Sequence, residues 1–82
     1  MNCLWFYKYN NDTIVVKSTD SNELLVNDVS QDKQYGISLS VELNGKLDDG
    51  KNVKALLTGL FPPKCELFVN SVRIDPVTTI QQ

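Results

Sequence analysis

The chain has 82 residues, of which 41% are hydrophobic and 22% are charged, a balance typical of a folded globular protein rather than a disordered segment. A chain of this length is too short for two independent hydrophobic cores, so we expect a single domain over residues 1–82. The formal net charge of -2 disfavours tight binding to nucleic acid, and no apolar run approaches the roughly 20 residues of a membrane-spanning helix.

An aromatic segment opens the chain and predicts a β-hairpin. Residues 3–9 are rich in Leu, Trp, Phe and Tyr, polar residues then break the pattern, and β-branched residues follow at 13–17. Apolar runs on both sides of an Asn/Asp break are typical of two paired strands. The apolar run 24–26, which ends at Asn27-Asp28, predicts a third strand.

The clearest periodicity in the sequence runs from Tyr35 to Leu43, where the apolar residues occupy every second position. Alternation of this length predicts one long strand with one face on the core and the other in water. A two-residue turn at Asn44-Gly45 would mismatch the two faces of the sheet, so we expect the turn at residues 48–50 instead.

Residues 51–59 fit two structural templates. Their apolar positions match a helical stripe, for which Gly59 is a suitable C-cap and the following prolines a stop. The same residues also match an alternating strand. The neighbouring segments are all strand-like, which favours a strand here.

The final third of the chain also indicates strands. Residues 65–74 form an apolar segment whose inward phase shifts at Asn70-Ser71, where we expect a β-bulge. Pro76 then restricts residues 77–80 to an edge strand or a tail. We recognise no internal repeat in the sequence. Together the elements predict a mainly β fold, a small antiparallel sandwich or barrel of five to seven short strands, with one short helix near residues 51–59 as an alternative.

The residues that most enzymes use are missing from the sequence. It has no histidine, which removes Ser-His and Cys-His nucleophiles, and it has no glycine-rich phosphate loop. Cys3 and Cys65 lack the spacing of a metal or redox site, so we expect reduced thiols, with a disulfide as the alternative in an oxidising compartment. We therefore predict a protein that is not an enzyme and that holds no cofactor and no metal. The first residues lack the features of a secretory signal, which predicts a cytoplasmic location.

The aromatic first strand is the leading candidate for contact with a partner. Trp5, Tyr7 and Tyr9 share one face of it, and such residues are favoured at interfaces because a polar tip joins a large apolar body. We expect Lys8 and Lys17 at the rim of this surface. The same residues are the ingredients of a stacking platform for single-stranded nucleic acid, which the net negative charge disfavours. Packing in the core is the alternative to either role.

Phe61 is the second candidate for contact, because the Pro62-Pro63 turn that follows can present its ring outward; the alternative is that the ring packs in the core. These features predict a small non-catalytic protein-binding module, an inhibitor or accessory protein that covers a functional surface of another protein. One alternative is a self-assembling structural subunit, which predicts homo-oligomers, and another is a single-stranded nucleic-acid-binding protein. We expect no membrane partner.

Overall fold

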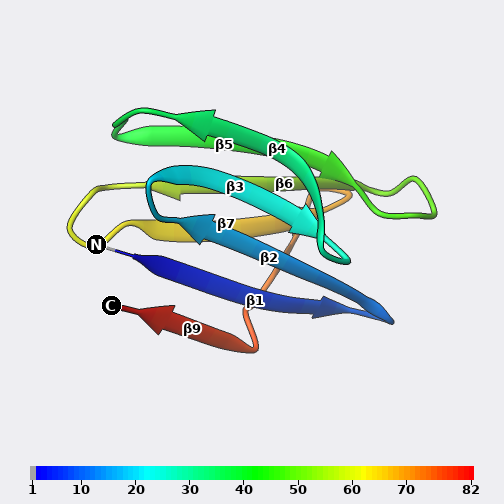
Figure 1. Ribbon diagram of the computed structural model, residues 1–82. Coiled ribbons are helices and arrows are strands. Elements are labelled where there is room, and N and C mark those ends of the chain that lie inside the picture. The colour runs from blue at the N-terminus through cyan, green and yellow to red at the C-terminus, as the bar shows by residue number, and fades with distance from the viewer. Residues whose placement is uncertain (1) are drawn as a thin grey trace.

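A computed structural model describes residues 2–82 of the protein, which form β-strands joined by turns and loops (Figure 1). The nine strands are, in chain order, β1 Cys3–Tyr9, β2 Asp12–Ser18, β3 Ser21–Val26, β4 Val29–Tyr35, β5 Ser40–Lys46, β6 Asn52–Thr58, β7 Lys64–Val69, β8 Val72–Ile74 and β9 Thr78–Gln81. The described residues contain no helix, and therefore none long and apolar enough to cross a membrane. The prediction of a mainly β fold is confirmed.

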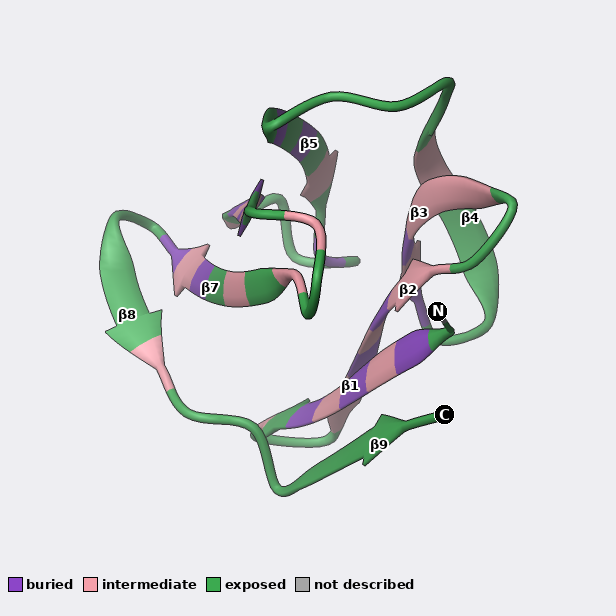
Figure 2. Ribbon diagram, turned by 90° about the vertical axis from the view of Figure 1, so that its left-hand side faces the viewer, coloured by how far each residue is buried: buried purple, intermediate pink, exposed green. Residues whose placement is uncertain are grey.

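The strands form two antiparallel sheets. The five-stranded sheet has the order β4-β3-β2-β1-β9, and the four-stranded sheet has the order β5-β6-β7-β8. Figure 2 shows β7 and β8 on the opposite side of the molecule from β3 and β4. The C-terminal strand β9 pairs with β1, so the first and last strands of the chain are neighbours.

One hydrophobic core lies between the two sheets. Along β1, β2, β5, β6 and β7, buried residues alternate with more exposed ones, as expected for strands with one face on a core (Figure 2). The buried residues of the core are Cys3, Trp5, Tyr7, Ile14, Val16, Leu24, Val26, Val41, Leu43, Leu47, Val53, Ala55, Leu57, Leu67 and Val69. Both sheets contribute to this one cluster, so neither sheet buries its apolar face alone.

The predicted number of strands and the predicted bulge need correction. The chain has nine strands rather than five to seven, because β4 is almost entirely polar and β8 and β9 are too short to show a period. At residues 51–59 the favoured prediction of a strand is confirmed, and the alternative helix is absent, since β6 pairs along both edges with β5 and β7. The expected bulge at Asn70-Ser71 is a two-residue turn between β7 and β8, with positive φ at both residues, as in the hairpin turns that match strand twist.

The long strand predicted from the alternation that begins at Tyr35 is also wrong. The chain leaves β4 at Gly36, whose φ of +95° is accessible to glycine, and re-enters a strand only at Ser40. Tyr35 and Leu39 are consequently exposed, whereas Leu43 is buried. The predicted turn at residues 48–50 is confirmed by a hydrogen bond of 2.9 Å from the Gly50 amide to the Leu47 carbonyl.

The structure reveals an internal repeat that the sequence analysis missed. The strand orders β4-β3-β2-β1 and β8-β7-β6-β5 describe the same meander, once in each sheet. Within it, residues 23–32 and 66–75 agree at six of ten positions, namely Glu23/Glu66, Leu24/Leu67, Val26/Val69, Asn27/Asn70, Val29/Val72 and Asp32/Asp75. The repeat was hidden because the loops that precede the two segments differ in length and because the remaining strands share hydrophobic pattern rather than identity.

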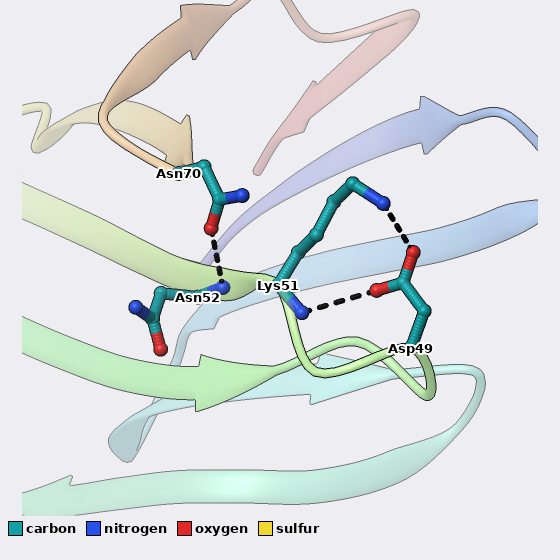
Figure 3. Close-up of polar contacts among 4 residues, drawn as sticks. All are labelled: Asp49, Lys51, Asn52 and Asn70. Atoms are coloured by element: carbon teal, nitrogen blue, oxygen red, sulfur yellow. Dashed lines mark hydrogen bonds and ion pairs between the residues drawn. The ribbon is translucent and has the colours of Figure 1, made fainter.

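Each copy of the meander has an asparagine with the same hydrogen bonds at its third turn, and Figure 3 shows the bond from the Asn70 side chain in the second copy. Asn70, with a φ of 47°, donates its amide to the Asn52 carbonyl at 2.8 Å, and its Oδ1 accepts the Asn52 amide at 2.9 Å. Asn27, with a φ of 49°, makes the same pair of bonds with Thr13 at 2.8 and 2.9 Å. Asparagine suits the position because it tolerates positive φ and carries a side-chain acceptor.

Side chains of β4 join the two sheets at the edge of β5. Gln31 Oε1 accepts the Lys46 amide at 3.2 Å, and Asp32 Oδ2 accepts the Asn44 amide at 2.9 Å. Gly45 permits this approach, because a Cβ there would lie 2.6 Å from the Cβ of Gln31. The exposed backbone of an edge strand is thereby bonded, which protects it from pairing with other chains.

Candidate protein-binding surface

The structure places two of the predicted contact residues inside the molecule. Trp5 is 6% exposed and Tyr7 is 1% exposed, and both point into the core from β1. The Tyr7 hydroxyl donates a hydrogen bond of 3.4 Å to Sγ of Cys65 on β7. Burial raises the pKa of Tyr7 well above its ordinary value and raises the pKa of the Cys65 thiol to about 11. Neither ring is offered to a partner or to a nucleic-acid base.

The other residues predicted on the first hairpin lie at its surface but do not form an aromatic patch. Tyr9 is half-buried and packs against the core. Lys8 is exposed and donates a hydrogen bond of 3.3 Å to Oγ1 of Thr13. Lys17 is half-buried and lies opposite Leu4 of the neighbouring strand β1. Lys8 and Lys17 were predicted to surround exposed aromatic rings of β1. Of the tryptophan and tyrosine rings on that strand, Tyr9 alone is partly exposed.

Phe61 is the predicted contact residue that the structure leaves open to solvent. Its side chain is 85% exposed in the loop between β6 and β7. The loop between β4 and β5 lies beside it, because the Gly59 amide donates a hydrogen bond of 2.9 Å to the Leu39 carbonyl. That second loop carries Ile37, which is 89% exposed, and Leu39, which is 70% exposed. We call Ile37, Leu39 and Phe61, with Tyr35 at the end of β4, the apolar end.

A pocket of about 230 Å³ opens between these two loops and the turn that joins β2 to β3. Its apolar lining includes Ile37, Leu60, Phe61 and Pro63 together with the buried core residues Val41 and Leu57. Its polar lining comes from residues 18–22 and from Ser38. The lining holds six apolar and six polar side chains, and a concave site that combines the two kinds can receive a side chain or a small ligand.

Sequence reasoning found Phe61 but assigned the other members of the apolar end to the core. The alternation from Tyr35 to Leu43 obscured the break, because a strand pattern cannot show where a chain leaves its sheet. The available signal was Gly36 together with the serines at 38 and 40, which are typical of loops. Exposed apolar residues that gather in one place are informative in a way that isolated ones are not.

Neither a metal-ligand cluster nor a disulfide is present among residues 2–82. No group of three or more His, Cys, Asp or Glu side chains in this range is placed to hold a metal ion. Cys3 and Cys65 are free thiols in the described structure rather than a disulfide. No family model, no curated protein and no solved structure matches the chain.

Proposed function

We propose that the protein is a non-catalytic binding module, an inhibitor or accessory protein that covers a functional surface of a partner protein with its apolar end. The observation that carries the proposal is the exposure of Ile37 and Phe61, which line one pocket, together with that of Leu39 in the same loop as Ile37. When a partner removes exposed apolar side chains of this size from solvent, the free energy of the complex falls by roughly 25 cal/mol per Å² of apolar surface buried. We also propose a cytoplasmic location, with which the two free thiols are consistent.

We further propose that the scaffold is an open sandwich rather than a closed barrel. Side chains of β4, and not a backbone ladder, bridge to β5 at one side of the molecule. In this arrangement the loops at the apolar end are set by two sheets that pack on a single core. A rigid scaffold of this kind presents loop residues with little loss of conformational entropy on binding.

Affinity purification from host extract with matched variants tests the proposal. The tagged protein is compared with Phe61→Ser and with Val72→Ser, a control at an exposed valine on β8 that is not in the pocket lining. We expect a stoichiometric partner to be retained by the wild type and by Val72→Ser and to be lost with Phe61→Ser. Equal retention of that partner by all three proteins would refute the role of the apolar end.

Self-assembly is a second candidate function, favoured by a row of partly exposed apolar side chains on the outer face of the five-stranded sheet. Phe6, Val15 and Leu25 lie in register on β1, β2 and β3, and each is half-buried. In a structural subunit these residues would be covered by another copy of the chain. Light scattering of the purified protein distinguishes the two functions, because a subunit forms larger species with rising concentration in the absence of any partner.

A further inference from the structure

The internal repeat separates residues that the fold requires from residues that it does not. Equivalent core positions in the two copies match in burial, as Leu24 and Leu67 are both fully buried and Val26 and Val69 are each 2% exposed. Even an exposed position matches, since the exposed fractions are 61% at Val29 and 64% at Val72. Where one copy has a feature that the other lacks, that feature is not needed to build the meander.

The loop that carries Phe61 is such a feature. The pair Lys17 and Glu23 in the first copy corresponds to Leu56 and Glu66 in the second, because Glu23 and Glu66 are equivalent. The connection between the paired residues is consequently four residues longer in the second copy than in the first. The short connection shows that a tight turn is sufficient here, so the longer loop of residues 59–63 is an addition to the repeated unit.

The remaining exposed large apolar residues also lie outside the matched segments. Apart from Val29 and Val72, they occur at the end of β4, in the link between the two copies, in the added loop and in the C-terminal extension, at Tyr35, Ile37, Leu39, Phe61, Val77 and Ile80. The link and the added loop are joined by the bond from Gly59 to Leu39 and together line one pocket. The two segments that are dispensable for the meander therefore carry Ile37, Leu39 and Phe61 of the apolar end.

The turn between β2 and β3 forms the remaining wall of the pocket and supplies a negative charge. The turn between β2 and β3, which is the short equivalent of the added loop, contributes residues 18–22 to the lining. Asp20 is the only ionisable residue of the lining, it is exposed, and its carboxylate makes no ion pair or hydrogen bond with the rest of residues 2–82. An unpaired carboxylate beside an apolar pocket complements a cation that is attached to an apolar group.

We propose that this pocket receives one large apolar side chain of the partner protein, with a lysine or arginine of the partner adjacent to it and facing Asp20. The inference rests on the proposed function and adds the chemistry of the partner. The volume of about 230 Å³ suits a single side chain, since pockets that enclose a drug-sized ligand are roughly 300–1,000 Å³. The apolar walls supply affinity, and the carboxylate selects the partner by charge.

Titration of the ¹⁵N-labelled full chain with short peptides tests this chemistry directly. The probes are acetyl-Ala-Phe-Arg-Ala-amide and the same peptide with Glu in place of Arg. We expect the Arg peptide to shift the amide signals of residues 18–22, 36–38 and 59–61 and to bind more tightly than the Glu peptide. Asp20→Asn should weaken the Arg peptide about fivefold, which corresponds to about 1 kcal/mol for a charge pair at ~4 Å in water. It should also remove most of the difference between the two peptides.

Three results would overturn the inference: no shifts at millimolar peptide, shifts confined to the outer face of a sheet, or equal affinity for the Arg and Glu peptides. Its failure differs from failure of the proposed function. A partner that is lost with Phe61→Ser but retained with Asp20→Asn, together with peptides that show no charge preference, would leave the function standing and reject the basic neighbour. A captured partner that is indifferent to Phe61→Ser would reject the function itself. Asp20→Asn should keep the wild-type spectrum, because the side chain is exposed.

Discussion

Substitution of Asn70 tests the role of the asparagine that ends the third strand of each meander copy. Alanine at this position loses the bond to the Asn52 amide and must hold a φ of 47° without the tolerance of asparagine. A hydrogen bond contributes about 1 kcal/mol, and left-handed backbone costs roughly 1–2 kcal/mol for most residues, of which asparagine avoids a part. We expect Asn70→Ala to lower the free energy of unfolding by about 2 kcal/mol. That loss is large against the roughly 3–5 kcal/mol that a domain of this size gains from its core.

The aspartate variants of the two equivalent residues provide the matched control. Asn70→Asp keeps the acceptor oxygen and the tolerance of positive φ, so we expect a change below about 0.5 kcal/mol. Asn27→Asp should destabilise, because Nδ2 of Asn27 donates to Oδ1 of Asp12 at 2.9 Å and a second carboxylate would repel it.

Urea unfolding followed by circular dichroism measures both pairs of variants at constant m-value. We expect Asn27→Ala to cost at least as much as Asn70→Ala, because it also loses the bond to Asp12. The penalty of Asn27→Asp should shrink below about pH 4, where carboxyl groups become protonated. If Asn70→Ala unfolds at the wild-type urea concentration, or if Asn70→Asp is as damaging as Asn70→Ala, the turn does not depend on the bond and the backbone conformation described.

Three further predictions concern the core and the joint between the sheets. Gly45→Ala should destabilise the protein by about 1–3 kcal/mol in urea unfolding, because the new Cβ would meet Gln31 at 2.6 Å; a smaller effect would show that β4 moves away from β5 without cost. Because burial raises the pKa of Cys65 from 9.0 to about 11, its contribution to stability is complete below pH 9 and is lost as the pH rises towards 11, by up to about 2–3 kcal/mol. Cys65→Ser should flatten this alkaline loss in pH-dependent unfolding, although Tyr7 adds a loss of the same sign, and an unchanged slope would contradict the assignment. Trp5, the single tryptophan, should emit at short wavelength and resist quenching by acrylamide in the folded state, and a solvent-like emission would place it outside the core.

Local sequence signals were sufficient where a strand alternates and its ends carry turn residues. The hairpin of β1 and β2, the strand β3 and the turn at residues 48–50 all follow from such patterns. The β-propensity of aromatic and branched residues and the two-residue period act within a few residues of the chain, so they can be read without knowing the fold.

Local signals did not predict the structure correctly where the same sequence pattern is compatible with two different structures. Apolar residues alternate without interruption through Ile37 and Leu39 into Val41, yet only Val41 reaches the core, because the chain crosses from one sheet to the other between β4 and β5. The aromatic rings of β1 matched both a contact surface and a core. Which face of β1 meets the opposite sheet depends on the packing of the two sheets, and this packing buries Trp5 and Tyr7.

The sequence by itself determined the class of the fold and the position of most strands, and it offered Phe61, which the structure leaves exposed, as a candidate contact residue. Only the tertiary structure decided that β1 lies inside a sheet between β2 and β9 and that the chain repeats one meander. It also brought the loops at Leu39 and Gly59 together around one pocket. The physical reason is that strand formation depends on neighbours along the chain, whereas an exposed surface is defined by what the packing of distant segments leaves uncovered.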